Sequence, residues 1–164
     1  QALWKGRKSA FGAMGTLAPN YYVQDGVVPR SRLPEIMRRV REVAAQHHVL
    51  IANVFHAGDG NLHPNILFDI RKEGELERVI QAGEAILRAC VEVGGSLTGE
   101  HGIGLEKKDY LGWLFSEADI DAMADVKRAI DPENRFNPAK LFPTPVTCGE
   151  IRRVPPQIPA GLWI

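Results

Sequence analysis

An Asp-Gly pair, Asp59-Gly60, lies between two apolar runs and constrains the fold of this chain more than any other feature. The run 49–55 before it and the run 65–68 after it are rich in the apolar and β-branched residues that strands favour. Asp-Gly between two such runs favours a tight β-hairpin. The chain is therefore expected to hold an antiparallel strand pair around this turn.

Two amphipathic helices are predicted, one before and one after the hairpin, because apolar residues recur there at helical spacing. The first runs from a cap at Ser31 to about His48, and the second covers about 73–93 and stops at Gly94-Gly95. The apolar positions are Leu33, Ile36, Met37, Val40, Val43 and Ala44 in the first helix and Leu76, Val79, Ile80, Gly83, Ile86, Leu87 and Cys90 in the second.

The remaining elements are shorter. The run 21–23 has strand character, with Asp25-Gly26 as a turn or bulge after it, and a short helix is expected over 105–111. Ser116 and Asp119 have the spacing of a capping box, which predicts a further helix ending before Pro132. This order of elements predicts an α+β fold, with a mainly antiparallel sheet and helices packed on one face.

Two histidines flank the hairpin turn. With a two-residue loop at Asp59-Gly60, Gly58 would face Asn61 and His56 would face His63. Directly opposed residues have Cβ atoms about 5 Å apart, so the two imidazoles could hold one divalent metal. In the same register Val54 would face Asn65, which could reach a ligand on that metal. The alternative is that both histidines are ordinary surface residues.

A glycine-rich loop, 96–104, offers a third ligand. A metal held by two histidines usually takes a carboxylate as well, and Glu100 is the best candidate. His101 would then lie beside the metal, where an imidazole makes a natural general base. The alternatives are an ordinary exposed loop or a phosphate-binding loop, although the acidic Glu100 argues against an anion.

Composition excludes several classes of protein. The chain has 164 residues and weighs 18.1 kDa, and its 45% hydrophobic and 24% charged residues are typical of a globular domain. Twenty basic side chains balance twenty acidic ones, so net charge gives no reason to expect nucleic acid as a partner. A disordered tail and a coiled-coil rod are excluded by the same composition.

The cysteines, the apolar stretches and the first residues of the chain indicate where in the cell the protein is expected. Cys90 and Cys148 form neither a CxxC pair nor a zinc spacing, so a disulfide scaffold is not expected. No apolar stretch approaches the ~20 residues of a transmembrane helix, and the first residues lack a signal peptide. The chain starts at Gln1 rather than Met, so we expect it to begin within something longer, in a cytoplasmic protein.

The two histidine-bearing motifs together resemble a known family. The segments 55–64 and 94–104, with 4–8, 21–30 and 136–140, are similar to the C-terminal domain of FAD-linked oxidases. That family includes D-lactate dehydrogenases, D-2-hydroxyglutarate dehydrogenases and the FAD-binding subunit of bacterial glycolate oxidase, to which the resemblance is strongest. It covers the chain to about Pro143.

The resemblance implies FAD and a divalent metal, zinc or manganese, as cofactors. The implied roles are metal ligation by His56, His63 and Glu100, proton abstraction by His101, substrate binding by Asn65 and Arg7, and flavin contact by Asn137. Val23 lies near the place where hydroxyglutarate-type relatives carry a cation for a second carboxylate. Its apolar character favours a small monocarboxylate.

The resemblance also implies what lies outside the chain. We expect residues 1–143 to form the substrate and metal domain, without its first part, and 144–164 to be a Pro-rich tail. FAD would be bound mainly by an N-terminal flavin domain, so the chain alone should be inactive. Companion oxidase subunits or a second copy are the expected partners, in the cytoplasm or peripheral to the inner face of the membrane.

The predicted function is therefore oxidation of a small 2-hydroxy acid, glycolate or D-lactate, to the 2-oxo acid. Two other functions fit the same histidines and carboxylate. One is a flavin-independent metal oxygenase with a facial triad of two histidines and a carboxylate. The other is a non-catalytic assembly domain in which the metal staples the hairpin.

Overall fold

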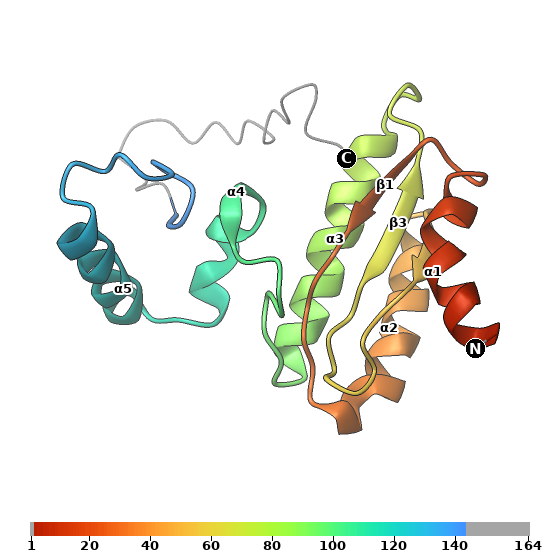
Figure 1. Cartoon of the computed structure of the whole chain (residues 1–164), viewed down its shortest axis with the longest axis horizontal. Coiled ribbons are helices and arrows are strands. Elements are labelled where there is room, and N and C mark those ends of the chain that lie inside the picture. The colour runs from red at the N-terminus through yellow and green to blue at the C-terminus, as the bar shows by residue number, and fades with distance from the viewer. Residues whose placement is uncertain (1, 144–164) are drawn as a thin grey trace. The chain divides into compact units, whose positions relative to one another are not determined.

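In the computed structural model, the part of the chain up to Gly102 is built around an antiparallel three-stranded sheet with strand order β1-β3-β2 (Figure 1). The model describes residues 2–143, although not the side chains of residues 2–5, 7 and 8. The helices and strands are α1 Ala2–Met14, β1 Asn20–Val23, α2 Leu33–Gln46, β2 Leu50–Asn53, β3 Pro64–Phe68, α3 Glu75–Glu92, α4 Gly104–Lys107 and α5 Glu117–Ile130, with short 3-10 helices η1 Arg30–Arg32 and η2 Lys108–Trp113. The predicted α+β fold with an antiparallel sheet is confirmed.

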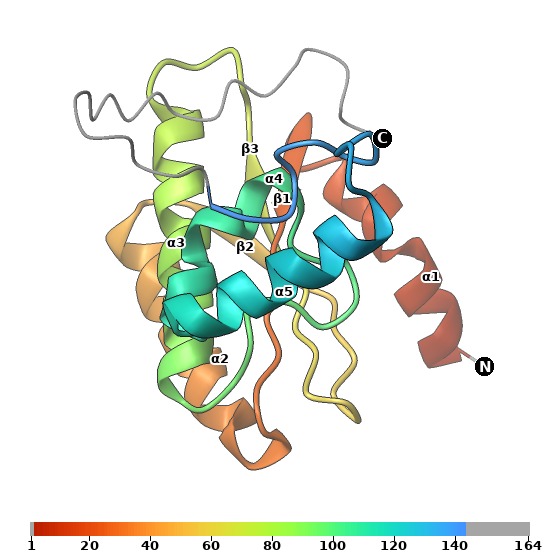
Figure 2. The same cartoon turned by 90° about the vertical axis from the view of Figure 1, so that its left-hand side faces the viewer.

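One face of the sheet carries the hydrophobic core. Tyr22 of β1, Ile66 of β3 and Ile51 of β2 lie opposite one another, and Ile66 is fully buried. Helices α2 and α3 cover this face with the apolar stripes that the sequence predicted (Figure 2). The buried core residues are Val28, Ile36, Val40, Val43, Leu62, Ile66, Phe68, Val79, Ala82, Ile86, Ala89 and Cys90.

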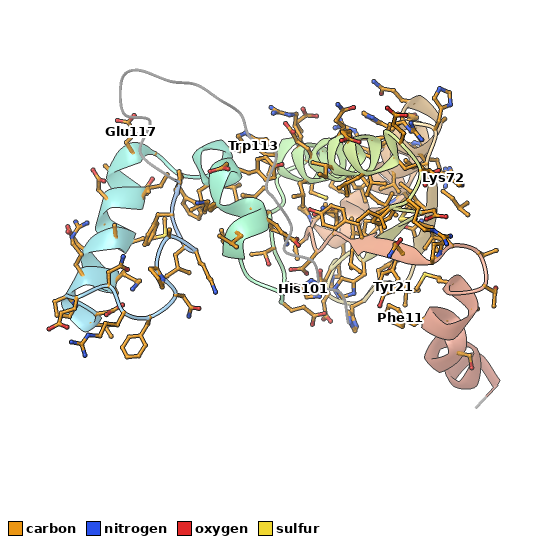
Figure 3. All side chains as sticks on the ribbon, turned by 90° about the horizontal axis from the view of Figure 1, so that it is seen from above. Phe11, Tyr21, Lys72, His101, Trp113 and Glu117 are labelled. Atoms are coloured by element: carbon orange, nitrogen blue, oxygen red, sulfur yellow. The ribbon has the colours of Figure 1, made fainter. Side chains whose placement is uncertain are left out.

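The other face of the sheet meets helix α1, which the sequence reading did not predict. The rings of Phe11 in α1 and Tyr21 in β1 have centroids 6.2 Å apart, and Met14 is buried. Both rings are labelled in Figure 3. Gly6 and Gly12 lie within this helix. Because glycine costs about 1 kcal/mol in a helix interior, local propensity hides α1, which nevertheless forms with Phe11 against Tyr21 of the sheet.

Helix ends follow the predictions in one case and not in another. At Ser116 the capping box is present: the Asp119 backbone N–H donates to Ser116 Oγ, and the Ser116 backbone N–H donates to Asp119 Oδ2. Ser31 is not a cap, because α2 begins after the 3-10 turn Arg30–Arg32. The helix predicted over 105–111 is α4 followed by the 3-10 helix η2.

The chain divides into two compact units, one up to Gly102 and one from Ile103 on. The second unit holds α4, η2 and α5, and the rings of Tyr110 and Trp113 stack within it. The predicted Pro-rich tail, 144–164, lies outside the described residues. Within residues 2–143, no helix has both the length and the apolar character required to cross a bilayer.

Candidate functional site

The hairpin exists, but its turn is wider than the sequence predicted. The bridge between His56 and Asn61 and the pairing of Ala52 with Asn65 leave four residues, 57–60, in the turn. The expected pairings of His56 with His63 and of Val54 with Asn65 are therefore wrong. A two-residue type I′ turn needs positive φ at both of its central residues, and here Gly60 has φ +74° whereas Asp59 is not in that region.

The two histidines nevertheless share one face of the hairpin. The register differs from the predicted one by two residues, and side chains alternate faces with a period of two. His63 is thus the diagonal neighbour of His56, and their ring centroids are 5.4 Å apart. An odd shift would have separated the two imidazoles onto opposite faces of the sheet.

The segment 24–28 lies between the hairpin and the glycine-rich loop and hydrogen-bonds to both. Toward the hairpin, the backbone N–H of Leu62 donates to the Gly26 carbonyl. Toward the loop, Val27 and Ser96 exchange both of their backbone hydrogen bonds. A Cβ on Gly95 would lie 2.0 Å from the Val27 carbonyl oxygen, so only glycine permits this close approach.

These contacts bring His56, His63 and Glu100 together. Oε1 of Glu100 lies 3.0 Å from Nε2 of His63 and 3.7 Å from Nε2 of His56. One ligand atom from each of the three residues lies within 4.8 Å of the others. Two imidazole nitrogens and one carboxylate oxygen at such separations form a donor set suited to zinc or a similar divalent ion.

His63 carries the feature that best tests whether a metal fits. Its Nε2 is buried and makes no hydrogen bond among the described residues, although it points at the Glu100 carboxylate. Burial lowers the pKa of His63, and the neighbouring His101 lowers it further, while Glu100 and Asp25 oppose the shift. The neutral imidazole that results is the form that binds a metal, so the residues fit a divalent ion.

His101 lies against this group. Its ring stacks on that of His63, with centroids 5.0 Å apart and planes 12° from parallel, and its Nε2 is 4.0 Å from Glu100 Oε1. The side chain is 46% exposed and therefore accessible to a small molecule. Figure 3 shows its position on the loop that follows α3.

Asp25 is a site residue that the sequence reading missed. Its fully buried carboxylate accepts hydrogen bonds from the consecutive backbone N–H groups of Gly99, Glu100 and His101. The loop thus binds an anionic group, as a phosphate-binding loop would, but the group is the chain's own carboxylate. Asp25, His63 and His101 also form a second set of candidate ligand atoms. The one sequence signal was an acid two residues after a strand.

Comparison with known proteins assigns this arrangement to a family. The model of the FAD linked oxidases, C-terminal domain, matches residues 1–141. The chain belongs to this family. The resemblance that the two histidine motifs indicated is thereby confirmed.

Relatives of this FAD-linked oxidase domain support the same assignment. The glycolate oxidase subunit GlcD of Escherichia coli K12 is 47% identical over 147 residues, covering 90% of this chain and 30% of that protein. GlcD of Bacillus subtilis is 43% identical, covering 86% and 30%. The mitochondrial D-lactate dehydrogenase [cytochrome] of Arabidopsis thaliana is 33% identical, covering 86% and 25%. The chain thus spans less than a third of these relatives.

Asn65 lies on the same face of the sheet as His63. Its Nδ2 donates to the carbonyl oxygens of His63 and Ala52, at 2.7 and 3.2 Å, which fixes the amide. Its Oδ1 is buried and lacks a hydrogen-bond partner among the described residues. Because a buried acceptor left unsatisfied costs about 1–3 kcal/mol, this oxygen is suited to accept from a bound molecule.

The last two predicted site residues are not brought to this cluster by any described contact. The backbone of Arg7 lies in α1, and its side chain is outside the described part of the structure. Asn137 belongs to the second unit, where it has φ +47° and lines a pocket beside α5. Their roles toward substrate and flavin stay predictions.

Proposed function

We propose that this chain is the metal- and substrate-binding part of an FAD-dependent oxidoreductase that converts a small 2-hydroxy acid, glycolate or D-lactate, to the 2-oxo acid. The observation that carries the proposal is the unpartnered, buried Nε2 of His63, which faces Glu100 beside His56. The names of the relatives, glycolate oxidase subunit and D-lactate dehydrogenase, support the substrate class.

The proposed cofactors are a divalent metal, zinc or manganese, and FAD. His56, His63 and Glu100 would hold the metal, and a flavin domain N-terminal to this one would bind FAD. When bound, the metal supplies Lewis acidity toward a hydroxyl oxygen and the flavin supplies the hydride acceptor. The chain's own residues then have to bind the substrate, orient it and receive its proton.

His101 is the proposed base. It would take the hydroxyl proton of the substrate on an imidazole nitrogen, as its exposed ring beside the ligand group allows. Asn65 would bind the substrate through its unpartnered Oδ1, and Arg7 would bind the substrate carboxylate through a two-pronged contact. Asn137 would contact the flavin.

Val23 supports a small monocarboxylate as the substrate. In the sheet register Val23 of β1 is directly opposite Asn65 of β3, so both side chains lie on the face that carries His63. An apolar side chain at this position offers no cation for a second carboxylate. Partners proposed for the assembled enzyme are companion oxidase subunits, because two of the relatives are named as subunits.

The test uses the flavin-loaded protein that carries this chain, mixed anaerobically with glycolate or D-lactate. We expect the wild type to reduce its flavin, which is measured as the loss of the flavin's visible absorbance. His101→Ala should slow reduction by about 10²–10⁴-fold, the usual contribution of a general base, while metal content stays unchanged. The control His47→Ala changes a histidine at the end of α2 and should leave the rate unaltered.

Other outcomes would contradict the proposal. A near-normal rate of flavin reduction in the His101→Ala variant would exclude His101 as the base. Oxygen-dependent turnover without flavin would instead indicate an oxygenase that uses two histidines and a carboxylate. A metal with no open coordination position, together with no turnover, would indicate a structural staple.

A further inference from the structure

The buried carboxylate of Asp25 lies at the point where three separate segments meet. It follows β1, and its segment 24–28 is hydrogen-bonded to the hairpin through Gly26 and to the loop through Val27. The backbone carbonyl of Asp25 also accepts the N–H of Gly99, at 2.9 Å. Asp25 is therefore tied to both of the segments that supply the candidate ligands.

Its carboxylate binds the loop almost entirely through one oxygen. Oδ2 accepts from Thr98 Oγ1 at 2.6 Å and from the backbone N–H groups of Gly99, Glu100 and His101 at 3.1, 3.2 and 2.8 Å. The Glu100 N–H is shared with Oδ1, also at 3.2 Å. Hydrogen bonds to a carboxylate are about twice as strong as neutral ones. This set of bonds therefore fixes the backbone of Glu100 and of His101.

We propose that Asp25 is the positioning residue of this site, holding Glu100 against His63 and His101 within reach of a bound substrate. The inference rests on the proposed function for the role of His101, but the placement of Glu100 holds for any metal in the group. Oδ1 of Asp25 lies 3.6 Å from Nε2 of His63, so the same carboxylate also faces the hairpin histidine.

The two oxygens of Asp25 have different surroundings. Oδ2 already accepts four hydrogen bonds, so the positioning of the loop falls to this oxygen, which is unsuited to a metal. Oδ1 lies 3.6 Å from His63 Nε2 and remains available as a candidate ligand atom. The side chain of Glu100, in contrast, is 52% exposed, and its ion-pair contacts within the described part of the chain are with the three histidines. Without Asp25, the exposed Glu100 would lose its fixed distance to His63.

The first experiment replaces Asp25→Asn in the flavin-loaded protein. The amide keeps the size of the side chain but is uncharged, so its oxygen accepts the same N–H groups more weakly. Its NH₂ group would also take the place of Oδ1, which shares the Glu100 N–H as an acceptor. Two quantities are measured: affinity for Co²⁺, from its visible absorption spectrum, and kcat and KM for glycolate or D-lactate at saturating metal. Replacing a residue that orients a metal ligand typically lowers metal affinity or activity by about 10–100-fold. We expect losses of that size in Co²⁺ affinity and in kcat, and a smaller change in KM.

The matched control is Asp69→Asn. Asp69 also anchors a turn, accepting from the backbone and guanidinium of Arg71, but it follows the opposite end of β3 from His63. It should leave Co²⁺ affinity and kcat within about twofold of the wild type. Amide hydrogen exchange over 98–102 should be fast in Asp25→Asn and slow in Asp69→Asn.

A second pair of variants covers the case in which Asp25→Asn fails to fold. Thr98 Oγ1 donates to Asp25 Oδ2 and accepts from the Gly102 N–H, so Thr98→Val removes both bonds. It should lower Co²⁺ affinity and kcat by a smaller factor than Asp25→Asn. Thr98→Ser keeps the hydroxyl and should restore both.

The outcomes are distinct. Unchanged Co²⁺ affinity and kcat in Asp25→Asn or Thr98→Val would overturn the positioning role, as would equal losses in Asp69→Asn. A Co²⁺ spectrum and affinity that shift only in the Asp25 and Thr98→Val variants support it. If the wild type reduces no flavin with a hydroxy acid, the proposed function fails, and the Co²⁺ and exchange measurements still decide the role of Asp25.

Discussion

The two faces of strand β3 are built on different physical principles. Ile66 and Phe68 point into an apolar core under α2 and α3, where the packing is non-directional. His63 and Asn65 point to the other face, where each keeps a buried polar atom without a hydrogen-bond partner among the described residues. Native proteins leave few such atoms, and they concentrate at functional sites. One face therefore packs against α2 and α3, and the part of the other face around His63 and Asn65 is prepared for ligands.

The largest expected effect tests the apolar face. Ile66→Ala should lower the free energy of unfolding by about 3 kcal/mol, because it removes a fully buried side chain and leaves a cavity. Affinity for Co²⁺ in the molecules that remain folded should change little. Thermal unfolding and cobalt titration measure the two quantities. A parallel loss of Co²⁺ affinity would show that the faces are not independent.

His63→Ala is the converse test. Affinity for Co²⁺ should fall by about 100-fold or more, since a ligand is removed and removing a partner of a ligand alone costs about 10–100-fold. The metal-free protein should melt near the wild-type temperature, because His63 lies outside the apolar core. His47→Ala serves as the control histidine. Unchanged metal affinity in His63→Ala would remove it from the ligand set.

Gly60→Ala should disturb both faces at once. Gly60 has a φ of +74°, in the left-handed region that favours glycine, and a Cβ there would lie 2.1 Å from the Val28 carbonyl oxygen. We expect a loss of about 1–2 kcal/mol from the backbone conformation alone, with weaker Co²⁺ binding as the hairpin separates from segment 24–28. Gly58→Ala has open space around its Cβ and should be nearly neutral. Thermal melting and cobalt titration compare the two variants.

The smallest effect concerns the far end of β3. The side-chain hydrogen bond from Arg71 lowers the pKa of Asp69 to about 2. Because the folded value lies below the unfolded value of about 3.9, the stabilisation is present above pH 3.9 and is lost as the pH falls toward 2. The melting temperatures of wild type and Asp69→Asn should therefore differ slightly at pH 6 and converge only as the pH falls to about 2. A constant difference would contradict this assignment.

The sequence predicted most of the architecture because the relevant signals are local. The stripes of α2 and α3, the strands on each side of Asp59-Gly60 and the Ser116 cap are all readable from short windows of residues. Helix α1 was missed, because its glycines weaken the local signal and its stability depends on contacts with the sheet. The hairpin register was two residues off, because the φ of Asp59 depends on its surroundings.

The sequence by itself determined which residues could hold a metal, since His56, His63 and Glu100 follow from residue type and motif spacing. Only the tertiary structure decided how they meet. Asp25 is far from Glu100 along the chain, and a single carboxylate binding three consecutive N–H groups leaves no periodic pattern to read. Periodicity reports which side chains are buried, whereas the partners of a buried polar group are fixed by distance and direction in three dimensions.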